Sequence, residues 1–141
     1  MFFELMQSYK IILFIIYCLT LDPHAFSQNI PELDAMFCGK KGESGPSGGA
    51  YTLEELQNCD FKIIPLDTSF TVTEFRLTLV EKGKEIIEKK INGNKIPHSF
   101  REQILIPTKK AIYLELIKAE SAQGQEVKIK PIAVRINETN P

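Results

Sequence analysis

Residues 70–79 read Phe-Thr-Val-Thr-Glu-Phe-Arg-Leu-Thr-Leu. Apolar and polar residues alternate along this stretch, with one slip near Thr73 and Glu74. A period of two is typical of a β-strand with one buried face. The slip predicts a β-bulge. With that bulge, five apolar side chains share one face of the strand: Phe70, Val72, Phe75, Leu77 and Leu79.

A hairpin is predicted directly after this strand. The turn lies at residues 81–84 and contains Gly83, and the second strand covers residues 85–91. An Asn-Gly-Asn sequence at residues 92–94 ends that strand. Two alternating runs separated by a short glycine-containing turn favour an antiparallel pair.

Two further strands are expected near the C-terminus. Residues 112–117 are apolar at most positions of both phases of the alternation, which predicts a strand largely buried on both faces. A turn at residues 121–125 leads into a last strand over residues 127–136. Pro131 interrupts that strand, and because proline cannot donate a ladder hydrogen bond, we expect a bulge or an edge position there.

Two short helices are predicted from capping boxes, in which a Ser or Thr side chain and a Glu three residues later satisfy each other's backbone N–H groups. One box runs from Thr52 to Glu55 and begins a helix over residues 53–58. The other box begins at Ser99, and Pro107 ends its helix.

Brief strands are expected at residues 36–38 and 61–64. Together these elements predict one mainly β domain of about six to seven strands with two short helices. A length of 141 residues leaves no room for a second core of ordinary size.

The N-terminus has the features of a signal peptide. Lys10 precedes an apolar run at residues 11–19, and the small residues Ala25 and Ser27 fit the side-chain pockets of signal peptidase. Cleavage is therefore expected between Ser27 and Gln28. The mature protein is expected to be periplasmic or secreted.

Two other interpretations of this segment are disfavoured. An uncleaved anchor requires about 20 apolar residues, about twice the length of the run. A lipoprotein attached through Cys18 requires a small residue before the cysteine, where this chain has Tyr17. No stable membrane span is therefore expected after processing. The predicted division is a signal peptide at residues 1–27, a short polar lead at 28–35, the β domain at 36–138 and a tail at 139–141.

Cys38 and Cys59 are the two cysteines of the mature chain. In an oxidising compartment they can close a loop of about 20 residues, which would stabilise the domain by about 3 kcal/mol. Two buried free thiols are the equal alternative, because the sequence does not supply the Cα separation of about 5.5 Å that the bond requires.

The mature chain is formally neutral. The first 27 residues hold two of the 18 acidic and one of the 17 basic residues, so 16 of each remain. Nucleic acids and anionic membrane surfaces attract proteins with a clustered excess of Lys and Arg, so neither partner is expected. The pairs Lys89-Lys90 and Lys109-Lys110 are interpreted as solvated ends of strands or turns.

No catalytic, cofactor-binding or metal-binding residues are predicted. The mature chain has one histidine, His98, expected at the exposed start of the second helix without partners for a triad or a ligand set. Residues 39–49 form a glycine-rich loop, but Ala50-Tyr51 stands where a P-loop needs Lys followed by Ser or Thr. We therefore expect that the protein is not an enzyme and has no cofactor.

Several segments occur together, in the same order, in one known domain. They are Phe-Cys-Gly-Lys-Lys-Gly at residues 37–42, the capped helix at 53–57, Asp60-Phe61, the strand at 70–75, Ile-Lys-Ala at 117–119, Gly124 and Pro131-Ile132. These segments resemble the C-terminal domain of GldM, the gliding-motility protein of the type IX secretion motor. The resemblance covers about residues 36–137, and full-length members carry a transmembrane helix and further periplasmic domains where this sequence has its expected signal.

The resemblance implies a periplasmic, immunoglobulin-like β-sandwich without catalytic residues. It also implies a protein partner in the cell envelope and a link to gliding motility or type IX secretion. Pro131 and the loop at residues 39–49 are the nearest candidates for contact with that partner, and a homodimer remains open. The alternative is a small-ligand-binding or enzyme-accessory domain with a pocket under Tyr51 and Phe61.

Overall fold

The computed structural model describes residues 30–44 and 49–136, and in this part of the chain the fold is mainly β, with ten strands and two helices. The strands are β1 Glu32–Leu33, β2 Ala35–Phe37, β3 Lys40–Lys41, β4 Gly49–Tyr51, β5 Ile63–Pro65, β6 Phe70–Glu81, β7 Lys84–Asn92, β8 Lys110–Ser121, β9 Glu126–Ile129 and β10 Ile132–Ile136. The helices are α2 Leu53–Gln57 and α3 His98–Ile104. The count exceeds the predicted six to seven strands because β1, β3 and β4 are very short and the last predicted strand divides into β9 and β10.

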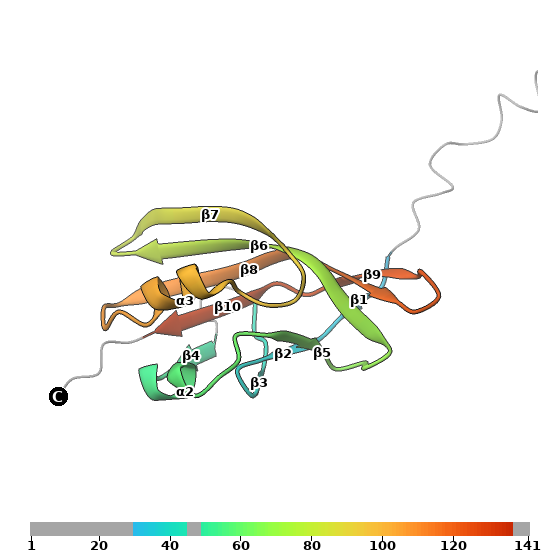
Figure 1. The fold of residues 1–141 in the computed structure, drawn as a ribbon, viewed down its shortest axis with the longest axis horizontal. Helices are drawn as coiled ribbons and strands as arrows, with labels where there is room; N and C mark the ends of the chain where they lie inside the picture. Colours follow the sequence, from blue (N-terminus) through green and yellow to red (C-terminus); the bar gives the residue numbers. More distant parts are fainter. Residues whose placement is uncertain (1–29, 45–48, 137–141) are drawn as a thin grey trace, which may run out of the picture.

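The main sheet has seven strands, and β8 is its central member (Figure 1). On one side β8 pairs antiparallel with β6, and β6 pairs with β7. On the other side both β9 and β10 pair antiparallel with β8. Each of these two strands has a short parallel neighbour, β1 beside β9 and β4 beside β10. The sheet is therefore mixed.

The predicted bulge in β6 is confirmed. The register of β6 against β8 shifts on both sides of Glu74. Four of the five apolar side chains assigned to the inner face are buried, and Phe70 is half-buried against the same core. The hairpin is also confirmed, with Lys82 and Gly83 at φ values of 51° and 74°. Two adjacent residues with positive φ match the twist of antiparallel strands.

The prediction that β8 is buried on both faces is wrong. Leu114 and Ile117 are buried, whereas Leu116 between them is 66% exposed. Leu116 has a φ of 49°, in the left-handed region that non-glycine residues rarely adopt. The alternation changes phase at this residue: Ile112 and Leu114 before it and Ile117 and Ala119 after it are buried, whereas Leu116 faces solvent.

Pro131 lies at the interruption between β9 and β10, where a bulge or an edge position was predicted. Ile129 pairs with Ile117 and Ile132 pairs with Leu114, so β9 and β10 continue along the same side of β8. On their other side β1 pairs as far as Ile129 and β4 pairs from Val134, so Pro131 lies between the positions that these two strands cover. Its missing N–H is accommodated where the ladder is interrupted.

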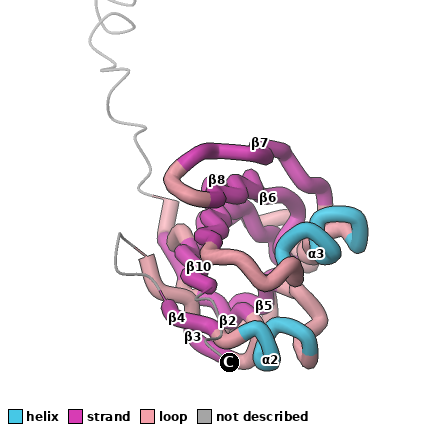
Figure 2. The backbone as a smooth tube through the Cα atoms, turned by 90° about the vertical axis from the view of Figure 1, so that its left-hand side faces the viewer, coloured by secondary structure: helices cyan, strands magenta, loops and turns pink. Residues whose placement is uncertain are grey.

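A second sheet of three strands, in the order β3-β2-β5, lies on the opposite side of the core (Figure 2). Both pairings in this sheet are antiparallel. It includes Ala35, which is buried, and β1 also precedes residue 36. The folded domain therefore begins inside the segment predicted to be a polar lead.

The first capping box is confirmed and the second is wrong. The Glu55 N–H donates to Thr52 Oγ1 at 3.1 Å, and the Thr52 N–H donates to the Glu55 carboxylate at 2.8 Å. In α3 the N-cap is Pro97, and no side chain caps the helix. The extended backbone of Pro97 starts the helix at His98, so Ser99 already lies inside the first turn.

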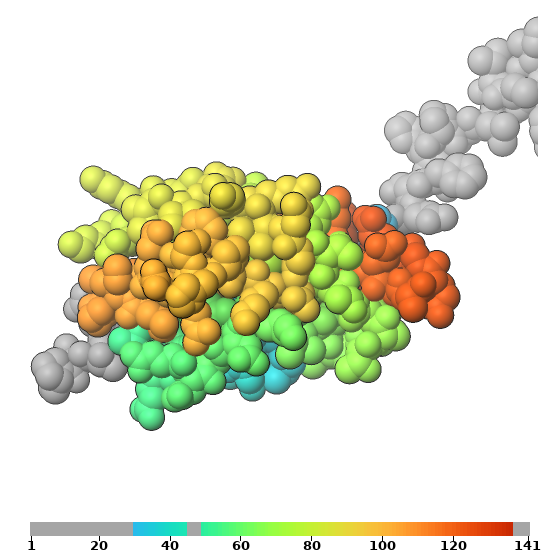
Figure 3. Space-filling model, in the orientation of Figure 1, coloured from blue at the N-terminus to red at the C-terminus, as the bar shows by residue number. Residues whose placement is uncertain are grey.

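The two sheets and both helices share one apolar core. Its largest fully buried side chains include three phenylalanines, Phe37, Phe61 and Phe75. Helix α2 contributes Leu56 and helix α3 contributes Ile104. Figure 3 shows the segment around α3 at the surface in front of the main sheet, so this helix covers part of the core.

The bulge residue Glu74 predicts how stability responds to acid. Its carboxylate lies 2.5 Å from Lys90 Nζ and 3.0 Å from Lys118 Nζ, and the hydrogen bond from Lys90, followed by that from Lys118, lowers its pKa from 4.5. A lowered folded-state pKa stabilises the fold above pH 4.5, and this contribution is lost as the pH falls through 4.5 to the folded value. We expect the melting temperature to fall over this range, and to fall less in Glu74→Gln.

Thermal melts at pH 7, 4.5 and 3 measure this difference. Glu32→Gln makes the same charge change at the exposed start of β1 and is the matched control. If Glu74→Gln follows the acid dependence of the unmodified protein, the two lysine contacts do not contribute as described.

Candidate functional site

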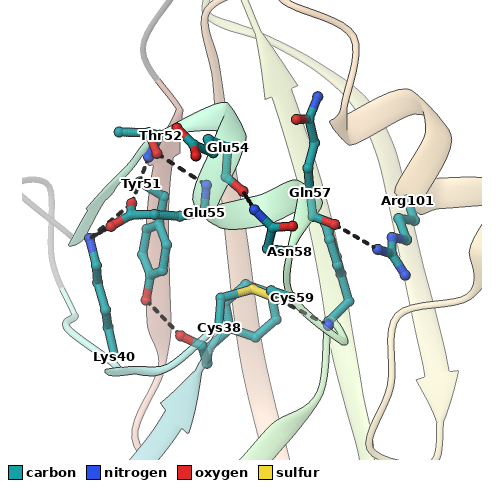
Figure 4. The surroundings of a disulfide bond; sticks show 12 residues. Cys38, Lys40, Tyr51, Thr52, Glu54, Glu55, Gln57, Asn58, Cys59 and Arg101 are labelled. Carbon is teal, nitrogen blue, oxygen red and sulfur yellow. Dashed lines mark hydrogen bonds and ion pairs between the residues drawn. A yellow bond between two sulfur atoms is a disulfide. The ribbon is translucent and has the colours of Figure 1, made fainter.

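Cys38 and Cys59 form a disulfide at one corner of the small sheet (Figure 4). Their Cα atoms are 5.1 Å apart and they are separated by 21 positions in the sequence. Cys38 follows β2 and Cys59 follows α2, so the bond joins the small sheet to the helix. Strands β3 and β4 and helix α2 all lie within the closed loop.

The turn at Cys38 and Gly39 places this cysteine. The two residues have φ values of 49° and 76°, and Phe37 pairs with Lys40 across the turn. Consecutive left-handed residues make the tight reversal that joins neighbouring antiparallel strands. Residues 39–49 are therefore not one open loop, because Lys40 and Lys41 pair with β2 as strand β3. Residues 45–48 lie outside the described part of the chain.

Lys40 connects β3 to the capped helix and to β4. Its Nζ lies 2.8 Å from the Glu55 carboxylate, donates to the Ala50 carbonyl at 3.1 Å and lies 4.8 Å from the centre of the Tyr51 ring. The hydrogen bond from Lys40, and next that from the Thr52 backbone, lowers the pKa of Glu55. The capping carboxylate therefore serves the helix and the neighbouring strand at once.

The volume beneath Tyr51 and Phe61 is filled. The Phe37 ring meets both rings edge-on, at centroid distances of 6.2 Å to Tyr51 and 6.0 Å to Phe61. The Tyr51 hydroxyl donates to the Phe37 carbonyl at 3.0 Å, and burial raises the pKa of Tyr51 to about 12. The alternative interpretation, a small-ligand-binding domain, required a pocket beneath Tyr51 and Phe61, and side chains fill that volume.

Outside this packed region, the disulfide borders an open hollow of about 300 Å³. The residues that line it are of mixed character: some are polar, some charged and some apolar. Its lining residues are Cys38, Gly39, Glu55, Asn58, Cys59, Asp60, Lys62 and Ile64.

An exposed apolar patch adjoins the hollow on the outer face of the small sheet. Met36 and Ile64 are directly opposite each other in the β2–β5 pair, and Leu66 follows on the same face as Ile64. Ile64 and Leu66 are each 49% exposed. We refer to Met36, Ile64, Leu66 and the adjoining hollow as the disulfide face.

Charged pairs border the disulfide face. Asp34 accepts from Lys41 at 2.9 Å and from Lys130 at 3.1 Å, which lowers its pKa. Lys41 stands directly opposite Met36 in the β2–β3 pair, and Glu55, the partner of Lys40, lines the hollow, so charged side chains border the apolar patch on these two sides. This is the usual arrangement of a protein-binding surface, in which the centre is apolar and the rim is polar.

The other residues considered from the sequence do not join this site. His98 is the first residue of α3, is exposed, and lies 3.2 Å from Glu102 through its Nε2. Within residues 30–44 and 49–136, no group of three or more His, Cys, Asp or Glu side chains is placed to hold a metal ion. Cys18, Ser27 and Gln28 lie outside the described residues.

The sequence reasoning missed Met36, Ile64 and Leu66. Strands of two or three residues are too short to show an alternation, so the sequence did not indicate which residues of β2 and β5 face solvent and which face the core. The available signal was the apolar run at residues 63–66, in which Pro65 excludes a helix interior.

The geometry defines a small mainly β domain with a disulfide-linked corner and an exposed apolar patch. No model of a known protein family matches the sequence, and no curated protein matches it. Across the described residues, neither helix has the length and apolar character needed to span a membrane.

Proposed function

We propose that this protein is an exported, non-catalytic module of the cell envelope that binds a protein partner through the disulfide face. The observation that supports the proposal is the exposure of Ile64 and Leu66 beside Met36, next to a hollow and bordered by charged side chains. Exposed apolar side chains grouped on one face and bordered by charge are characteristic of protein-binding surfaces.

Export is supported by two independent features. Residues 1–27 have the sequence pattern of a cleavable signal peptide, with cleavage between Ser27 and Gln28. The Cys38–Cys59 disulfide is a bond of oxidising compartments, which include the periplasm and the cell exterior. We therefore place the mature protein in the periplasm or outside the cell.

We further propose that the domain is related to the C-terminal domain of GldM and shares its immunoglobulin-like β-sandwich. The support for relatedness is the ordered set of sequence segments between residues 37 and 132. The support for a sandwich is that two sheets contribute to one core. On this proposal the envelope partner belongs to the gliding-motility or type IX secretion machinery.

Site-specific photo-crosslinking tests the disulfide face as a binding surface. A photoreactive amino acid is placed at Ile64 of the full chain, produced in its own cells, and at Gln123 in the β8–β9 turn as the control. We expect one covalent adduct with an envelope protein from Ile64 and none from Gln123. Adducts of equal yield from both positions would contradict the proposed surface.

The same surface predicts the effect of an acidic substitution. In Ile64→Asp we expect affinity for the captured protein to fall by about tenfold or more, because an unpaired charge enters the apolar centre of the contact. Ile64 is half exposed, so the fold should persist, and circular dichroism of the variant checks this. Gln123→Asp is the control with the same added charge.

A further inference from the structure

A second hollow, of about 430 Å³, lies at one end of the main sheet. Three separate parts of the chain meet there: the β6–β7 turn, the start of β8 and the end of β10 (Figure 1). The described residues that line it are Val80, Lys82, Gly83, Lys109, Lys110, Ala111, Tyr113, Arg135 and Ile136. This hollow is separate from the disulfide face.

The strand register explains why the surface is hollowed at this point. Val80 pairs with Ala111, and Ala111 pairs with Arg135, so a small side chain stands between two larger ones in one row across three strands. Two positions along, on the same face, Tyr113 pairs with Ala133. The turn adds Gly83, which has a φ of 74° and no side chain. Small residues on neighbouring elements thus leave room between Tyr113 and Arg135.

The lining is cationic. It contains three lysines and one arginine, and no acidic side chain is found among the described residues that line the hollow. Glu81, which lies between Val80 and Lys82 in the sequence, accepts a hydrogen bond from Thr108 Oγ1 at 2.7 Å and is not among the lining residues. Because the mature chain is neutral, this concentration of positive charge is local and is not a property of the whole domain.

Lys110 is not the solvated residue that the sequence suggested. It is only 4% exposed, and its Nζ donates to the Ile106 carbonyl and to Thr108 Oγ1. These contacts fix the start of β8 and hold a positive charge beneath the hollow. Lys82 and Lys109 are exposed, so their side chains are free to change rotamer and contact a bound anion.

We propose that this hollow binds a small organic oxyanion of roughly monosaccharide size, with Lys82 and Lys109 contacting the charged group. Lysine ammonium groups bind carboxylate, phosphate and sulfate oxygens as compact point charges. Val80 and Ala111 supply an apolar floor, and the Tyr113 ring supplies a flat wall for the organic part of the ligand. A hollow of this volume is within the ordinary range of small-molecule sites.

Titration of the purified, exported protein, followed by NMR at constant ionic strength, tests the proposal. The probes are glucuronate, glucose 6-phosphate and uncharged glucose, which distinguish a carboxylate from a phosphate and both from the sugar alone. We expect saturable shifts of the Gly83 and Ala111 amides with at least one anion and none with glucose. Shifts of these amides by all three probes alike, or by none, would overturn the proposal.

A charge-matched pair of double variants completes the test. In Lys82→Gln/Lys109→Gln we expect the dissociation constant for the anion to rise about tenfold, as for the loss of two partly exposed ion contacts. Lys95→Gln/Lys128→Gln removes the same charge from exposed positions that do not line the hollow and should leave the constant unchanged. If both double variants bind the anion equally weakly, the effect is due to net charge alone, and the hollow is not a specific site. Photo-crosslinking at Ile64 is independent of either result.

Discussion

Replacing Phe37 by alanine is expected to lower the free energy of unfolding by about 3–5 kcal/mol. Phe37 is fully buried and stands between the Tyr51 and Phe61 rings, where β2 faces the rest of the core. Removing its ring leaves a cavity bordered by two other large rings that cannot both move into it. A domain of this size is stable by about 5–15 kcal/mol in total, so this variant should lose a large part of its stability.

Urea denaturation followed by circular dichroism measures the loss. Phe37→Leu keeps most of the volume and should cost less than the alanine variant. Tyr51→Phe removes only the hydroxyl that donates to the Phe37 carbonyl, and its expected cost is about 1 kcal/mol. If Phe37→Ala costs no more than Tyr51→Phe, then ring packing is not what holds the small sheet on the core.

Reduction of the Cys38–Cys59 disulfide is expected to lower the free energy of unfolding by about 3 kcal/mol. The bond spans 21 positions, and the segment that it closes contains five of the eight glycines of the chain. Glycine has the greatest backbone freedom in the unfolded state, so a bond across this segment removes much of that freedom. Denaturation with and without a reducing agent measures the difference.

The double variant Cys38→Ala/Cys59→Ala is the control for reduction. Its stability should match that of the reduced protein and should not respond to the reducing agent. Thiol titration of the denatured protein, purified from its own cells, checks the bond itself. Two free thiols in protein that has never met a reductant would contradict the disulfide, whereas none would support it.

The elements predicted well from the sequence are those specified by neighbouring residues. The β6 bulge followed from a slip in alternation within residues 70–79, and the β6–β7 hairpin followed from the glycine-containing turn at residues 81–84. The first helix followed from Thr52 and Glu55, which satisfy each other directly. In each case the signal and the interaction lie within the same short window.

The elements that sequence reasoning missed depend on distant residues. Strands β1 and β4 exist because β9 and β10, about 80 to 100 positions later, offer them parallel partners. The phase change at Leu116 can be read only from the register on both sides of β8. The disulfide face depends on the pairing of Met36 with Ile64, which no local pattern specifies.

The position of β8 in the chain has a consequence for the order of folding. This strand is the centre of the main sheet, yet it begins only at Lys110, and β1 and β4 find their partners later still, in β9 and β10. Contacts between such distant segments form slowly, because the intervening chain must first be closed into a loop. We therefore expect the main sheet to remain incomplete until the last strands have emerged. A chain that is threaded through a membrane N-terminus first would thus stay extended during passage and would complete its fold on the far side.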